Sequence, residues 1–242
     1  MSIISGKKPV FKRVLLKISG EALAGEKKNG LDFGVIRAVC EAVKTCVELN
    51  VEVAIVVGGG NFWRGVKDGE GKIERTRSDH MGMLATIMNS LALADMLEQL
   101  DVQVRVQTAL AISAIAEPYI RLKADKHLTQ GRVVIFAMGT GHPYFSTDTA
   151  AVLRAAEIDA EVILLAKNID GVYTADPKLD PNAKKLDTIS YQDMLEQRLA
   201  VMDTTATSLS MENEIPVVLF ALKDPENIVR VVTGENIGSR VG

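Results

Sequence analysis

The sequence has few of the features that mark secreted, metal-binding or membrane-spanning proteins. Only two of its 242 residues are cysteine, and Cys40 and Cys46 point to different sides of one predicted helix, where they cannot readily be bridged. We expect two reduced thiols and no protein metal site. The longest apolar runs, such as 133–138 and 217–222, reach about a third of the roughly 20 residues of a membrane helix. Because the N-terminal residues also have no apolar stretch of signal-peptide length, we expect a cytoplasmic location and no membrane partner.

An excess of basic residues is missing as well. Lys plus Arg total 28 against 31 for Asp plus Glu, and the formal net charge is -3. That charge provides no positive field for a phosphate backbone, so nucleic acid is not an expected partner. Hydrophobic residues make up 47% and charged residues 24%, which is the balance of an ordinary globular protein and excludes disordered and fibrous classes.

Short β-branched runs alternate with longer helical patterns along the chain. Strands are predicted at 13–18, 51–57, 102–106, 132–137, 161–165 and 217–221. Most of these runs are apolar throughout, which is typical of strands covered on both faces by helices. We therefore predict an α/β fold, a three-layer αβα sandwich with a mainly parallel central sheet. It forms a single domain over residues 10–242, after a flexible N-terminus of residues 1–9.

Two segments interrupt the alternation of strands and helices. Residues 65–79 are rich in charge and glycine, and we expect a mobile or solvent-facing loop there. Residues 176–187 contain two prolines among charges, which predicts a turn-rich excursion. Neither segment has the character of a linker between domains.

Glycine turns follow the first two predicted strands. Ligands of open α/β sheets bind outside the carboxyl ends of the strands, so these turns are candidate sites. After the first strand, Lys17 precedes a turn at Gly20 that can present N–H groups to a phosphate, although a plain surface lysine is the alternative. After the second, the triplet 58–60 lets the backbone approach a ligand, and Arg64 can reach phosphate oxygens, unless the triplet is only a hinge. Neither a P-loop nor a protein-kinase H-R-D motif occurs.

Two later turns carry further polar groups. Residues 139–149 combine glycines, hydroxyls and Asp148 before a helix predicted at 149–157, and this Asp148 either caps the helix or orders a lysine or a metal. Residues 168–177 contain an Asp-Gly pair that predicts a hairpin turn. Tyr173 can flank an adenine there and Asp176 can accept from a ribose hydroxyl, whereas a plain edge hairpin needs no ligand.

Taken jointly, four motifs resemble the amino acid kinase superfamily in order and spacing. They are Lys-Ile-Ser-Gly-Glu-Ala at 17–22, Gly-Gly-Gly-Asn at 58–61, the segment 140–148 and the segment 170–177. Residues 79–86, Asp-His-Met-Gly-Met-Leu-Ala-Thr, together with 140–148, are similar to those of bacterial uridylate kinases. That family phosphorylates UMP with ATP in pyrimidine nucleotide synthesis, and the resemblance runs from about Val10 to Thr233.

The resemblance implies an ATP-dependent nucleoside monophosphate kinase and places its site residues. The implied catalytic residues are Lys17, Arg64 and Asp148. The implied ATP-binding residues are Lys17, Ile18, Ser19, Gly20, Gly60, Arg64, Lys167, Asn168, Tyr173 and Asp176. The implied UMP-binding residues are Gly59, Asp79, Thr140, Gly141, His142, Pro143, Tyr144, Phe145, Ser146 and Thr147. Mg²⁺ would bridge the ATP phosphates and be held largely by the nucleotide and water.

The family also implies a homohexamer, inhibition by UTP and activation by GTP. The GTP expectation stays open, because residues 25–30, where the family places part of its activator region, are lysine-rich here. His142 stands where many members have Asn, and Lys167 stands where some have a hydroxyl residue. Lys167 either adds positive charge toward a phosphate, which is the interpretation we favour, or faces solvent.

Two other functions are compatible with parts of the pattern. Another amino acid kinase would act on a carboxylate, carbamate or isopentenyl phosphate, but Asp79 and the segment 140–147 suit a nucleoside monophosphate. A non-catalytic nucleotide sensor would need no transfer machinery, and the joint presence of Lys17, Arg64, Asp148 and Asp176 argues against it.

Overall fold

The computed structural model describes residues 8–175, 177, 179–197, 199 and 201–242. The strands are β1 (Arg13–Ile18), β2 (Glu52–Val57), β3 (Val104–Thr108), β4 (Glu117–Pro118), β5 (Val133–Ala137), β6 (Val162–Lys167), β7 (Val172–Tyr173), β8 (Lys185–Leu186), β9 (Thr188–Ile189), β10 (Val217–Ala221) and β11 (Ser239–Val241). The helices are α1 (Gly20–Leu23), the 3₁₀ helix η1 (Gly25–Lys27), α2 (Phe33–Glu48), α3 (Gly65–Gly69), α4 (Arg75–Gln99), α5 (Arg121–Thr129), α6 (Thr147–Glu157), α7 (Tyr191–Glu196), α8 (Thr204–Glu212) and α9 (Glu226–Val232).

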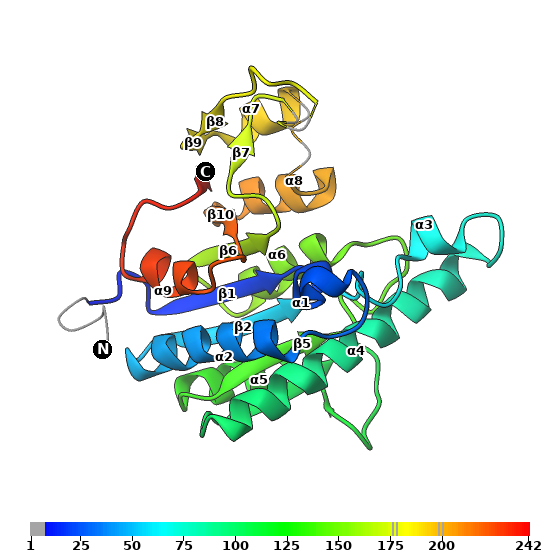
Figure 1. Ribbon diagram of the computed structural model, residues 1–242. Helices are drawn as coiled ribbons and strands as arrows, with labels where there is room; N and C mark the ends of the chain where they lie inside the picture. The colour runs from blue at the N-terminus through cyan, green and yellow to red at the C-terminus, as the bar shows by residue number, and fades with distance from the viewer. Residues whose placement is uncertain (1–7, 176, 178, 198, 200) are drawn as a thin grey trace.

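In the described part of the chain, nine strands form one sheet in the order β4-β3-β5-β2-β1-β6-β10-β11-β9. Every neighbouring pair is parallel except β10 with β11. The remaining pair, β7 and β8, forms a small antiparallel sheet that projects beyond the main one (Figure 1). The predicted mainly parallel sheet is confirmed.

Helices cover both faces of this sheet, as β1 illustrates. Leu16 belongs to an apolar core that includes residues of α2, α4 and α9, whereas Leu15 belongs to a second core with residues of α5, α6 and α8. Successive residues of a strand point to opposite faces, and both of these side chains are fully buried, so helices cover both faces of β1. The αβα sandwich is therefore confirmed (Figure 1).

The charged segment 65–79 is not the loop that its composition predicts. It contains α3 and the first turn of α4, whose first N–H groups are capped by the Glu74 carboxylate. Trp63 Nε1 donates to Ser78 Oγ at 3.0 Å, and Ser78 Oγ donates to the Gly65 carbonyl at 2.7 Å. These hydrogen bonds fix α3 against α4, a non-local contact that local composition cannot indicate.

The other boundaries differ in smaller ways. The Asp170-Gly171 pair precedes β7 and does not form the turn between β7 and β8, so that hairpin prediction is wrong in position. The prediction of a flexible N-terminus falls mainly on residues 1–7, outside the described residues, and the single-domain boundary at residue 10 stays a prediction. Within the described residues, no helix combines the length and hydropathy that crossing a membrane requires.

Candidate active site

The site lies where the carboxyl ends of four neighbouring strands meet. Strands β5, β2, β1 and β6 are adjacent in that order, and Ile18 at the end of β1 pairs with Val57 of β2 and Ala166 of β6. The turns that follow these four strands are the four that the sequence singles out. Parallel pairing brings them together at one edge, as expected for an open α/β sheet.

Two lysines at this edge share one carboxylate. Lys17 Nζ forms an ion pair with Asp148 Oδ1, and Lys167 Nζ donates to Asp148 Oδ2 at 2.9 Å. Lys17 lies two residues after Leu15 on β1, so its side chain points to the face that α6 covers, and Asp148 stands in the first turn of α6. The expectation that Asp148 orders a lysine is met, and Ser146 caps the helix instead, accepting from the N–H of Asp148.

Burial and charge shift these groups from their ordinary titration. Burial lowers the pKa of Lys17, against the attraction of Asp148, and the neighbouring Lys167 lowers it further. Burial by itself would raise the pKa of Asp148, but the two ammonium groups outweigh it and hold that pKa below the ordinary value. Asp148 is therefore an ionised carboxylate that orders two cations, rather than an acid that donates a proton.

Asp203 completes this cluster, and the sequence reasoning missed it. It caps α8 by accepting from Ala206 N at 3.0 Å, and it accepts from the hydroxyls of Ser146 and of Thr149, the latter at 3.1 Å. Its negative charge also acts on Lys17. An Asp before a helix is interpreted locally as a cap, so only the fold reveals that the Asp203 charge acts on Lys17.

The glycine triplet is held by a pair of buried amides. Asn89 Nδ2 donates to Asn61 Oδ1 at 2.7 Å and Asn61 Nδ2 donates to Asn89 Oδ1 at 2.9 Å, while Asn89 Nδ2 also lies 2.6 Å from the Gly58 carbonyl oxygen. A Cβ on Gly59 would lie 2.7 Å from the Gly82 carbonyl oxygen of α4. The triplet therefore permits close packing between the backbone of this turn and α4, where a side chain would not fit.

A cavity of about 400 Å³ opens above these turns. Its lining includes Lys17, Ser19, Gly20, Glu21, Gly58, Gly59, Gly60, Thr147, Lys167, Asn168 and Ile169. At its rim, Arg64 pairs with Glu21 at 2.5 Å. The two lysines and the backbone N–H groups of the glycine turns suit a chain of phosphates.

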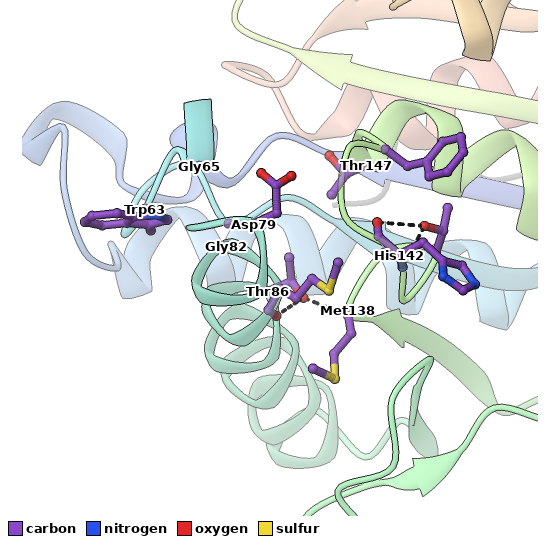
Figure 2. Close-up of a pocket in the computed structure, with 13 residues that line it drawn as sticks. Trp63, Gly65, Asp79, Gly82, Thr86, Met138, His142 and Thr147 are labelled. Atoms are coloured by element: carbon purple, nitrogen blue, oxygen red, sulfur yellow. Dashed lines mark hydrogen bonds between the residues drawn. The ribbon is translucent and has the colours of Figure 1, made fainter. Parts of the chain in front are cut away.

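A second, smaller cavity of about 140 Å³ lies between α4 and the loop after β5 (Figure 2). Its lining includes Gly59, Trp63, Gly65, Asp79, Gly82, Met83, Thr86, Met138, Gly139, Thr140, His142, Phe145 and Thr147. Gly59 and Thr147 line both cavities, so the two meet at the glycine triplet. If one molecule occupied each cavity, the two would have their ends next to each other at Gly59 and Thr147.

Helix α4 fixes the loop that closes the second cavity. Asp79 Oδ2 accepts from Tyr144 N at 2.8 Å, and Thr86 Oγ1 accepts from Met138 N at 2.8 Å. Residues 79 and 86 are seven apart and lie on one side of the helix, which spaces the two anchors along the loop. Thr86 belongs to the Asp-His-Met-Gly-Met-Leu-Ala-Thr motif but was given no role from the sequence.

Other predicted site residues stand in these loops without lining either cavity. Gly141, Pro143, Tyr144 and Ser146 belong to the loop after β5, and Tyr144 is exposed. The Ile18 side chain is buried in the core, so only its backbone can reach a ligand. The Tyr173 hydroxyl donates to Asp170 Oδ1 at 2.9 Å on the projecting hairpin, and Asp176 lies outside the described residues.

The donor set fits Mg²⁺ only as a companion of bound phosphates. Among the described residues, no three His, Cys, Asp or Glu side chains converge as a metal cage. Both oxygens of Asp148 face lysine ammonium groups. Phosphate oxygens and water would therefore supply most of the coordination.

Comparison with known proteins places the chain in a family. A sequence profile of the amino acid kinase family matches residues 12–221. The structure of UMP kinase from Bacillus anthracis is 39% identical with a TM-score of 0.92, covering 96% of this chain and 96% of that chain. UMP kinase from Ureaplasma parvum is 38% identical with a TM-score of 0.90, covering 96% and 99%. Uridylate kinase from Archaeoglobus fulgidus is 30% identical with a TM-score of 0.74, covering 95% and 99%. The chain belongs to the amino acid kinase family and, within it, groups with the UMP kinases.

Proposed function

We propose that this chain transfers the γ-phosphoryl group of ATP to UMP, giving ADP and UDP in pyrimidine nucleotide biosynthesis. The observation that carries the proposal is the junction of two cavities at Gly59 and Thr147. The larger one has the lysines and glycine turns of a phosphate site, and the smaller one has the Asp79 carboxylate and the hydroxyls of a nucleoside site. The assignment of the individual contacts is part of the proposal.

In this reaction the protein positions two anions and stabilises the charge between them. Phosphoryl transfer passes through a loose transition state, so it needs in-line placement and cations more than covalent chemistry. Lys17 and Lys167, ordered by Asp148, face the transferred group, and Arg64 leaves Glu21 to join them. UMP is already ionised at neutral pH, so no general base is required.

Mg²⁺ bound to ATP supplies further charge neutralisation when the nucleotide is present. In this proposal Ser19, Gly20, Gly60 and Asn168 hold the ATP phosphates. Tyr173 of β7 contacts the adenosine, and Asp176 is proposed to do so as well. The segment Thr140–Thr147 and Asp79 hold UMP, with Asp79 on its ribose.

A coupled assay of ADP release tests the function. The purified chain is given ATP, Mg²⁺ and one acceptor from a panel of UMP, CMP, AMP and acetylglutamate. UMP is the expected acceptor, because a buried group matched to the uracil 4-oxygen is left unpaired by the cytosine amino group. Equal kcat/KM for all acceptors, or no ADP release with UMP, would contradict the proposal.

We further propose that the enzyme is a homohexamer in which α4 packs against a second copy. Met81, Leu84, Met88 and Leu91 recur every three or four residues on α4 and are exposed, although such a stripe is normally covered. Sedimentation at micromolar concentration is expected to give six times the chain mass. A monomeric mass would remove this proposal, and Leu84→Glu is expected to shift the assembly toward smaller species.

Regulation by nucleotides is the last part of the proposal. UTP inhibits by occupying the UMP site, so its inhibition is competitive with UMP. GTP activates from a separate site to which the loop Gly25–Gly30 contributes. Activation requires that GTP bind more tightly when substrate is bound, so a flat rate across a GTP titration at subsaturating UMP would contradict it. We propose a cytoplasmic location for the reaction.

A further inference from the structure

The strongest unassigned feature is a contact between the start of α4 and the loop after β5. Arg75, the first residue of α4, donates from Nε to Asp79 Oδ2 at 2.8 Å. The same oxygen accepts from Tyr144 N, and the Arg75 guanidinium lies 4.9 Å from the centre of the Tyr144 ring. Arg75, Asp79 and Tyr144 thus form a closed three-residue contact, which we call the α4 clasp.

Helix stability does not explain this arginine. A cation at the first position of a helix opposes the helix dipole, and an Arg four residues before an Asp is the weaker order for an ion pair along a helix. The neighbouring Arg77 adds a second positive charge in the same turn. Arg75 is therefore placed unfavourably for the helix dipole, and its ion pair with Asp79 has the weaker order, so the helix alone gives little reason for an arginine here.

The loop that Arg75 holds is under backbone strain. Tyr144 has φ +73° and Met138 has φ +66°, in the left-handed region that non-glycine residues avoid. Such conformations persist only where the surroundings fix them. Thr86 anchors the beginning of the loop at Met138, and the α4 clasp anchors its end at Tyr144.

The clasp also sets the orientation and the charge of Asp79. Asp79 Oδ2 accepts from two donors, so Oδ1 is the oxygen left for a ligand. Gly65 gives this oxygen room, because a Cβ on residue 65 would lie 2.4 Å from Oδ1. Figure 2 shows Asp79 on α4 at the cavity that Gly65 and Thr147 also line. A bare carboxylate there would repel a nucleoside monophosphate, and the guanidinium offsets that charge.

We infer that Arg75 is a positioning residue for the acceptor nucleotide, which orients Asp79 and holds the Tyr144 loop closed over the acceptor cavity. The inference rests on the proposed function, because it assigns that cavity to UMP. Arg75 does not reach the transferred phosphoryl group in this assignment. Its loss weakens binding of the acceptor in the ground and transition states alike.

The test is a set of four variants assayed for KM and kcat. Arg75→Gln is expected to raise the KM for UMP by roughly tenfold, the scale of one charge-assisted hydrogen bond, with kcat and the KM for ATP within about twofold. Tyr144→Ala is expected to do the same, and Arg75→Lys to recover part of the loss. Arg77→Gln is the matched control: it removes the same charge from the same exposed helix turn, and Arg77 donates no hydrogen bond to Asp79 or Tyr144 among the described residues.

Binding is measured separately through Trp63, the single tryptophan, which lines the acceptor cavity. The Kd for UMP from its fluorescence is expected to rise in step with KM, and the double variant of Arg75→Gln and Tyr144→Ala to be no worse than the more affected single one. An unchanged KM and Kd in a folded Arg75→Gln, a fall in kcat alone, or additive effects would overturn the inference. If Arg75→Gln does not fold, Arg75→Lys and Tyr144→Ala decide. A wild-type chain without UMP turnover contradicts the proposed function instead.

Discussion

Replacing Lys17 by methionine tests the catalytic centre most directly. The variant keeps most of the buried side-chain volume and removes one cation from a cluster in which Lys17 and Lys167 face Asp148 and Asp203. A preorganised charge aimed at the reacting group is worth about 10²–10³ in kcat, or about 2.7–4 kcal/mol of barrier. We expect kcat to fall by that factor and the KM for UMP to change little.

The same geometry predicts a small effect of this change on folding. Asp148 keeps its hydrogen bond from Lys167, so the variant leaves no buried carboxylate unpaired, and we expect a loss of about 1 kcal/mol. Asp148→Asn is the contrasting variant, because it takes the shared counterion from both lysines and is expected to cost about 3 kcal/mol.

Urea denaturation measures both losses, and the coupled assay measures kcat. A Lys17→Met enzyme with kcat within tenfold of the wild type would refute the reasoning. So would a Lys17→Met variant less stable than Asp148→Asn.

Three further predictions follow from buried polar groups. Because burial lowers the pKa of Lys17, kcat/KM for ATP is expected to decline at a pH below the ordinary 10.5. Between the lowered pKa of folded Lys17 and 10.5, Lys17 is protonated in the unfolded chain but not in the folded one, so the free energy of unfolding rises with pH while activity falls. A decline of kcat/KM at the same pH in Lys17→Met would contradict this. Asn89→Ala leaves Asn61 without its buried amide partner and is expected to cost about 2–3 kcal/mol in urea denaturation, whereas a loss under 1 kcal/mol would show that water replaces the bond. Burial raises the pKa of Cys40 and of Cys46 to about 12, so a thiol reagent is expected to label neither in the folded protein and both in urea.

Local patterns in the sequence predicted six of the nine strands of the main sheet in the described part of the chain, and missed the short strands β4, β9 and β11. The predicted strand 13–18 coincides with β1, and 217–221 coincides with β10. A run that is apolar on both faces is stable only where helices cover both sides, so the pattern indicates strand and layer together. The glycine turns after β1 and β2 were also recognisable, because their close backbone approaches exclude most side chains.

Alternation along a strand fixed the side to which Lys17 points, but not what it meets there. Lys17 and Lys167 are 150 positions apart, and they share Asp148 only because β6 pairs with β1 and α6 covers the face that both lysines point to. Strand order depends on the packing of the whole sheet, which no local window contains.

The same reason explains the residues that sequence reasoning missed or misassigned. Asp203 has the local signature of a helix cap, and only the contact of α8 with α6 brings its carboxylate to the lysine cluster. The segment 65–79 has the composition of a loop, yet it contains α3 and the first turn of α4, and Trp63 contacts Ser78 within it. The sequence by itself determined the six apolar strands of the main sheet and the positions of the turns that follow β1, β2, β5 and β6. The tertiary structure decided which charged groups form ion pairs, because Lys17, Asp148, Lys167 and Asp203 come from different elements that only the packed fold brings together.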